Sequence, residues 1–106
     1  MINLDRNGDV FVLTMDMGEN RWNTNFVRAF NSRLDEALAS KGPAALVTCS
    51  SNAKFFSNGL DLDWRRQEGD GEGGDKSVFG DEFFLLMSKL ITFPMPTLCA
   101  VNGHGF

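Results

Sequence analysis

Two short apolar runs constrain the fold of this chain more than any other feature. They are "AALVTCS" at residues 44–50 and "TLCAV" at residues 97–101, and each has the length of a strand. A continuous apolar run, without polar alternation, is typical of a strand that is buried on both faces of a parallel sheet flanked by helices. The sequence therefore predicts an α/β fold, and its 106 residues suffice for one small domain.

The N-terminal segments predict a hairpin. Residues 2–6 and 10–16 have the pattern of strands, and "NGD" at residues 7–9 between them is a strong short-range hairpin signal. The polar, glycine-containing "MGENRWN" at residues 17–23 predicts a loop.

Two helices are expected after this loop. The first begins near Asn23 or Thr24, either of which can cap it, and "GP" at residues 42–43 ends it. The second spans about residues 78–92 and ends at "FPMP", because two prolines cannot continue a helix. This second helix is unusually apolar, so we expect it to be covered on more than one side.

Charge and composition exclude several classes of protein. A formal net charge of -4 argues against a nucleic-acid binder, since such proteins usually carry a basic face. No apolar run approaches the ~18 residues of a membrane span, and the first residues lack the apolar core of a signal peptide. Cys49 and Cys99 lie inside the two apolar runs and are expected to be buried, reduced thiols. Without a signal peptide or a membrane span, we expect an intracellular soluble protein. Metal ligands do not cluster in the sequence, so we expect no metal site.

Two further features carry little chemistry. The acidic, glycine-rich residues 68–76 predict a flexible surface loop; "GDGEGG" within it matches a dinucleotide-binding string, but Asp70 and Glu72 would repel phosphate. The single histidine, His104, lacks a recognisable catalytic partner and is expected to be structural or to face solvent.

The stretch "KFFSNGLDLDW" at residues 54–64 is the candidate functional segment. Gly59 permits a backbone turn that other residues resist, and such a turn can leave amide N–H groups unpaired. Asp61 is well placed to cap a following helix. The pattern fits an oxyanion-binding loop at a helix start, and it equally fits a plain loop with a capping aspartate.

Together, "KFFSNGLDL" and "PMPTLCAVNGHGF" some forty residues later resemble the crotonase family, the enoyl-CoA hydratase/isomerase superfamily. The first motif looks most like the branch of Δ3-Δ2-enoyl-CoA isomerases. The resemblance implies an α/β fold: an incomplete crotonase-like ββα spiral with an N-terminal hairpin, two helices and buried parallel strands. Residues 1–106 would then be the N-terminal portion of a single crotonase-like domain.

The resemblance also implies a mechanism, in which an acyl-CoA thioester binds and its enolate is stabilised by two backbone N–H groups. By motif position the first donor is the amide of Leu60. Coenzyme A enters only as part of the substrate, with no other cofactor, and Lys54 and Arg65 are expected near its phosphates. The residues that the resemblance assigns to substrate binding are Arg21, Trp22, Asn23, Phe56, Ser57, Asn58, Gly59, Leu60 and Asp61.

The family's second oxyanion amide and its catalytic glutamate would lie beyond Phe106, so we expect this chain alone to be inactive and its parent to be an isomerase of fatty-acid β-oxidation. The resemblance further implies a homotrimer or hexamer, located in the cytoplasm or in peroxisomes or mitochondria. Three alternatives remain open. They are an enoyl-CoA hydratase, an inert truncated fragment that binds CoA or a protein, and an unrelated α/β module that binds partners through its apolar second helix.

Overall fold

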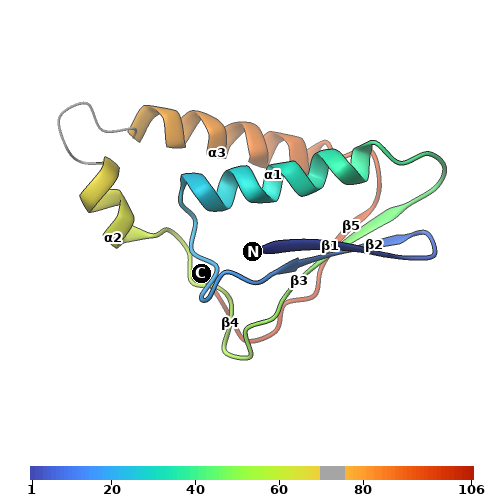
Figure 1. Cartoon of the computed structure of the whole chain (residues 1–106), viewed down its shortest axis with the longest axis horizontal. Coiled ribbons are helices and arrows are strands. Elements are labelled where there is room, and N and C mark those ends of the chain that lie inside the picture. The colour runs from blue at the N-terminus through green and yellow to red at the C-terminus, as the bar shows by residue number, and fades with distance from the viewer. Residues whose placement is uncertain (70–75) are drawn as a thin grey trace.

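The computed structural model describes residues 1–69 and 76–106, which form a layer of helices over a mixed sheet (Figure 1). The sheet has the strand order β1-β2-β3-β5. Its strands are β1 (Ile2–Asn7), β2 (Val10–Met15), β3 (Ala45–Ser50) and β5 (Thr97–Cys99).

Strand pairing confirms the predicted hairpin and the predicted parallel strands. β1 and β2 are antiparallel, and the turn between them contains Gly8 with a φ of 62°, a left-handed conformation that glycine adopts without strain. β2 pairs with β3 in parallel, and β3 pairs with β5 in parallel. The hairpin thus supplies one antiparallel edge to an otherwise parallel sheet.

Helix α1 (Thr24–Leu38) confirms the first predicted helix and identifies its cap. The side chain of Asn23, one of the two proposed caps, accepts a hydrogen bond from the Phe26 amide at 2.9 Å. The helix buries one apolar side against the sheet. Its buried residues are Phe26, Val27, Phe30, Leu34 and Ala37.

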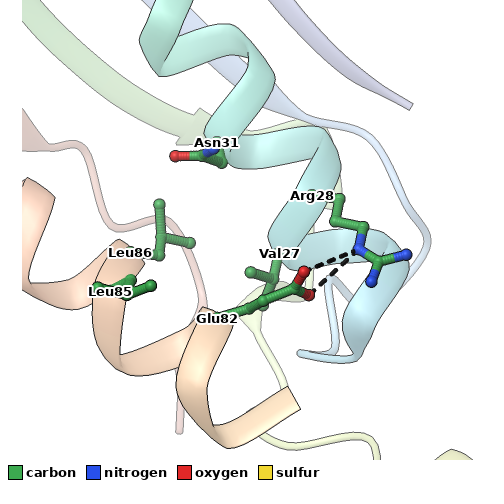
Figure 2. Close-up of a pocket in the computed structure, with 6 residues that line it drawn as sticks. All are labelled: Val27, Arg28, Asn31, Glu82, Leu85 and Leu86. Carbon is green, nitrogen blue, oxygen red and sulfur yellow. Dashed lines mark hydrogen bonds and ion pairs between the residues drawn. The ribbon is translucent and has the colours of Figure 1, made fainter. Parts of the chain in front are cut away.

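Helix α3 (Lys76–Ile91) lies beside α1 and runs in the same direction (Figure 1). Arg28 reaches across from α1, and its Nε donates to both carboxylate oxygens of Glu82 at 3.2 and 3.1 Å (Figure 2). Further along, the Lys89 ammonium donates to Asn31 at 2.8 Å and to Asp35. These polar contacts bridge the rim of the helix pair, while Leu86 of α3 is buried beneath it.

The structure corrects the expected burial of the two apolar runs. β3 buries only alternate residues, Leu46 and Thr48, because the helices cover one face of the sheet. All three residues of β5 are exposed, because no element of the described residues covers either face of this edge strand. Both cysteines are free thiols, but Cys49 is half-buried and Cys99 is exposed, so the prediction that they are buried is wrong.

The expectation that the second helix is covered on more than one side is also wrong for this chain. Phe79 and Leu86 of α3 are buried, but Phe84 and Leu85 are each 71% exposed and Ile91 is 84% exposed. The helix rests on one side, and no described element packs on the other. Within residues 1–69 and 76–106, no helix is both long enough and apolar enough to cross a membrane.

A small second sheet was not predicted. β4 (Phe55–Ser57) and β6 (His104–Gly105) pair in parallel, although both segments were expected to be loops or turns. Short, glycine-flanked segments carry no periodic pattern, so only their meeting in space defines them as strands. After β4 come the short helix α2 (Leu62–Trp64) and a single π-helical turn, η1 (Arg65–Gly69). Most of the flexible loop expected at 68–76, residues 70–75, lies outside the described residues.

Candidate functional site

Two segments far apart in the chain lie side by side in Figure 1, next to the mark for the C-terminus and below the start of α1. They are residues 19–23 and 57–61, and we call the pair the site ladder. The Asn58 amide donates to the Glu19 carbonyl at 2.9 Å, and the Trp22 amide donates to the Gly59 carbonyl at 2.8 Å. The Asp61 amide returns to the Trp22 carbonyl at 3.0 Å. The ladder therefore fixes the backbone on both sides of the Gly59–Leu60 peptide.

The turn predicted at Gly59 is present. Its φ is 75°, in the left-handed region that favours glycine over residues with a side chain. Leu60 follows in an isolated parallel bridge with Trp22, and its side chain is 45% exposed. Glycine thus accommodates the left-handed backbone conformation while the next residue stays aligned with the ladder.

The amides of residues 58–61 differ in one respect. Those of Asn58 and Asp61 are paired within the ladder, and the Gly59 amide donates to the Ser57 Oγ at 3.3 Å. The Leu60 amide donates to no atom of the described residues. An amide left unpaired between satisfied neighbours is the kind of donor that an oxyanion site requires.

Asn20 and Ser57 lie beneath this turn. Asn20 is fully buried and has a φ of 53°, which asparagine tolerates better than most residues. Its Nδ2 donates to the Ser50 Oγ at 2.8 Å and to the Phe56 carbonyl at 3.1 Å, while its Oδ1 accepts from the Met17 amide at 3.0 Å. The Ser57 hydroxyl donates to the Asn20 carbonyl at 2.8 Å. Sequence reasoning missed Asn20; the available signal was an asparagine two residues after Gly18 in a polar loop.

Asn23 and Asp61 are engaged with each other and with the starts of two helices. The Asn23 Nδ2 donates to the Asp61 Oδ2 at 3.0 Å, while its Oδ1 caps α1. The Asp61 Oδ1 accepts from the Trp64 amide at 3.1 Å, which confirms the predicted helix cap. Both polar ends of each side chain are therefore used inside the protein.

Glu19 organises the charges on the outer rim of the ladder. Its carboxylate accepts from the Asn58 Nδ2 at 3.1 Å and from the Arg21 Nε at 2.8 Å. The hydrogen bond from Asn58 and the one from Arg21 hold the pKa of Glu19 below its usual value. Arg21 also approaches Asp63 at 3.9 Å, so its guanidinium is held by acidic neighbours.

An open hollow of about 470 Å³ adjoins the Leu60 turn. It is lined by Trp22, Asn58, Gly59, Leu60, Leu62, Phe83 and Phe106. Trp22 forms its aromatic wall, with its ring centroid 4.6 Å from that of Phe26 and 5.5 Å from that of Phe83. A mainly apolar hollow beside an unpaired backbone N–H suits a long acyl chain that carries one polar head.

A second hollow of about 560 Å³ shares Trp22 and Phe106 with the first. Phe56 and Ser57 line this one, so both hollows together include six of the nine residues proposed for substrate binding. Arg21, Asn23 and Asp61 line neither of them.

Charged side chains are absent from the linings of these two hollows within the described part of the chain. Lys54, proposed to lie near phosphates, lies over the Phe55 ring at 5.2 Å from its centroid, and Arg65 caps the end of α2. Neither lines either hollow. The hollow between α1 and α3 in Figure 2 measures about 120 Å³, below the roughly 300–1,000 Å³ of a typical ligand site.

The last residues of the chain close the back of the site. The Phe106 amide donates to the Ser57 carbonyl at 3.0 Å, and the His104 amide donates to the Lys54 carbonyl at 2.8 Å. Gly103 allows this approach, because a Cβ at its position would lie 2.2 Å from the Lys54 carbonyl oxygen. His104 is exposed and lies between two phenylalanine rings, consistent with a structural role.

The fold, with its hairpin, parallel strands and open glycine turn, is that of a crotonase-like protein. An enoyl-CoA hydratase from Shewanella pealeana superposes with a TM-score of 0.85 at 24% identity, over 96% of this chain and 39% of that one. At this identity the match establishes the fold alone.

Sequence comparison gives the family. The peroxisomal enoyl-CoA delta isomerase 2 of Arabidopsis thaliana is 33% identical over 108 residues, and enoyl-CoA delta isomerase 3 of the same plant is 31% identical over 106 residues. The chain belongs to the crotonase superfamily. No family model matches it. The matches cover 99% of this chain but 45% and 44% of the two relatives, so the chain spans less than half of their length.

Proposed function

We propose that the protein binds an acyl-CoA thioester and stabilises its enolate through the Leu60 amide. The observation that carries this proposal is that the Leu60 N–H is unpaired among the described residues, between paired amides and beside an apolar hollow of about 470 Å³. Removing a proton from the carbon next to the thioester carbonyl places negative charge on the carbonyl oxygen. A preorganised N–H aimed at that oxygen lowers the energy of the charged state.

We further propose that the reaction is the isomerisation of a 3-enoyl-CoA to a 2-enoyl-CoA. The proton leaves C2 and a proton is added at C4, so that the double bond moves and atoms are conserved. The two Arabidopsis relatives named as enoyl-CoA delta isomerases support this choice over hydration. A hydratase would add water to the 2-enoyl-CoA, and a direct comparison of the two rates separates the alternatives.

The described residues supply one donor and no base. No aspartate or glutamate in the described ranges lines either hollow, and isomerisation requires a base within hydrogen-bond reach of the substrate. We therefore propose that the 106-residue chain alone does not turn over enoyl-CoA and that the full-length protein supplies the remaining groups. The exposed apolar residues of α3 further support a homotrimer or hexamer of the full-length protein, which sedimentation would test.

The test replaces the Leu60 amide by an ester, which removes the N–H and keeps the side chain. In the full-length protein we expect kcat/KM for 3-enoyl-CoA to fall by about 10²–10³. Leu60→Ala, which keeps the amide, is the matched control and should retain activity within about tenfold, since only the exposed side chain changes.

Three results would overturn this proposal or a part of it. An ester variant with unchanged activity would remove Leu60 as the donor, and faster hydration of 2-enoyl-CoA than isomerisation of 3-enoyl-CoA would replace the isomerase by a hydratase. Absence of turnover with either substrate would overturn the enzymatic proposal.

A further inference from the structure

We infer that the hydroxyl of Ser57, held by the carbonyl of Asn20, is a positioning group for the Leu60 donor. This inference rests on the proposed function. The Ser57 Oγ donates to the Asn20 carbonyl at 2.8 Å and accepts from the Gly59 amide at 3.3 Å. A single hydroxyl thus connects a fully buried loop residue to the peptide that precedes Leu60.

The direction of this contact is fixed by Asn20. Because a carbonyl can only accept, the Ser57 proton must point toward Asn20, which leaves the oxygen lone pairs for the Gly59 N–H. Asn20 itself cannot rotate freely, since its side chain is held by Met17, Ser50 and Phe56. The hydroxyl therefore acts as an oriented acceptor.

The Ser57 hydroxyl determines which of two adjacent amides, Gly59 or Leu60, is available to a ligand. A glycine turn with φ near 75° could present both the Gly59 and the Leu60 N–H to a ligand. The Ser57 hydroxyl occupies the first and draws it toward the protein interior, where Ser57 is 5% exposed. Only the Leu60 N–H then remains for the substrate, at a set angle.

Neither residue is itself a catalytic residue. Asn20 is fully buried, and the Ser57 hydroxyl is already committed to two protein partners, so the effect on the reaction passes through the Gly59–Leu60 peptide. Misplacing a reacting group by about 1 Å can cost about 10²-fold in rate. A loss of the relay should therefore reduce kcat more than it changes KM.

The first test measures amide hydrogen exchange in the unmodified full-length protein by NMR. We expect the Gly59 amide to exchange at least about tenfold more slowly than the Leu60 amide, and Ser57→Ala to abolish this difference. Equal exchange of the two amides in the unmodified protein would overturn the inference. This result does not depend on any activity, so it is separate from a failure of the proposed function, which shows as absence of turnover.

The second test compares Ser57→Ala with Ser50→Ala in the isomerase assay. Ser50 is a matched control, because its hydroxyl also contacts Asn20, at 2.8 Å, but makes no bond to Gly59. We expect Ser57→Ala to lower kcat about 10–100-fold with KM changed less than about threefold, and Ser50→Ala to lower kcat less than about threefold. Equal losses of kcat in the two variants would assign Ser57 a general structural role and overturn the inference.

The third test combines Ser57→Ala with the ester at Leu60. If the hydroxyl acts only by aiming the Leu60 N–H, its removal should cost less than about threefold once that N–H is gone. A full 10–100-fold additional loss would show that Ser57 acts elsewhere and would overturn the inference.

Discussion

The site ladder and helix α3 differ in how far their side chains and backbone groups find partners within the chain. In the ladder, the amides of Asn58, Gly59 and Asp61 and the side chains of Asn23 and Asp61 all find partners within the chain. Helix α3 instead leaves large apolar side chains uncovered. Apart from the Leu60 amide, the backbone and side-chain groups named here are paired across two segments that are far apart in sequence, whereas α3, a regular helix, is incomplete in packing. A segment can thus be regular in secondary structure and still leave its apolar side chains unpacked.

The largest expected effect concerns the backing of the ladder. Gly103→Ala would place a Cβ 2.2 Å from the Lys54 carbonyl oxygen at a φ of 73°, so the two loops behind the ladder must separate. We expect a loss of about 3–5 kcal/mol in the free energy of unfolding, from overpacking and left-handed strain together. Urea unfolding followed by tryptophan fluorescence measures it.

Gly8→Ala is the control for that change. Gly8 has a similar φ of 62°, but nothing lies within 4 Å of the added Cβ. It should cost about 1–2 kcal/mol, the left-handed strain alone. Equal losses in the two variants would mean that the close approach behind the ladder does not exist.

The second prediction compares a buried with an exposed position on helix α3. Leu86 is 2% exposed and Ile91 is 84% exposed. Leu86→Ala should cost about 2–4 kcal/mol of unfolding free energy through lost burial and a cavity. Ile91→Ala should stay within about 0.5 kcal/mol in the monomeric chain. A large loss at Ile91 would indicate that this side is covered in solution, which concentration-dependent sedimentation would detect.

The third effect tests whether the ladder acts as one unit. Asn23→Ala and Asp61→Ala each remove a helix cap and should each cost about 1 kcal/mol. Because the two side chains are hydrogen-bonded to each other, the double variant should cost less than the sum by about 0.5 kcal/mol or more. Strict additivity in urea unfolding would contradict their coupling.

The smallest effect is a pH dependence on the rim of the ladder. The pKa of Glu19 is lowered in the folded protein, chiefly by hydrogen bonds from Asn58 and Arg21. A carboxyl group whose pKa is lower in the folded protein stabilises the fold at pH values above its unfolded-state pKa, which is near 4.5. This stabilisation is lost as the pH falls through the pKa of the folded state. The difference in unfolding midpoint between the native protein and Glu19→Gln should therefore be largest above pH 4.5 and shrink below it. A difference that grows on acidification would contradict the assigned shift.

Much of the fold was predictable because its signals are local. The turn at Gly8, the cap of α1 at Asn23 and the cap of α2 at Asp61 each depend on residues within three positions of one another. Continuous apolar runs likewise predicted the parallel strands β3 and β5. The exposure of β5 could not be predicted, because burial depends on which neighbours cover a strand.

The candidate site was predictable only in part. The motif around Gly59 and the position of Leu60 follow from a short stretch of sequence and its family resemblance. The partners of that stretch do not, because the register between residues 19–23 and 57–61 is set by the whole domain. Asn20 escaped notice for the same reason. Its importance comes from three hydrogen bonds to Ser50, Phe56 and Ser57, which lie 30 to 37 positions away in the chain.

The bond between Asn23 and Asp61 has a consequence for the synthesis of the protein. The two residues are 38 positions apart, so a ribosome that adds roughly 5–20 residues per second completes Asp61 roughly 2–8 s after Asn23. During that interval α1 can already form with its own cap on the nascent chain, while the Leu60 turn does not yet exist. Because a helix of 15 residues is marginal in water without packing partners, α1 depends on the later strands for its stability even though its cap is made first.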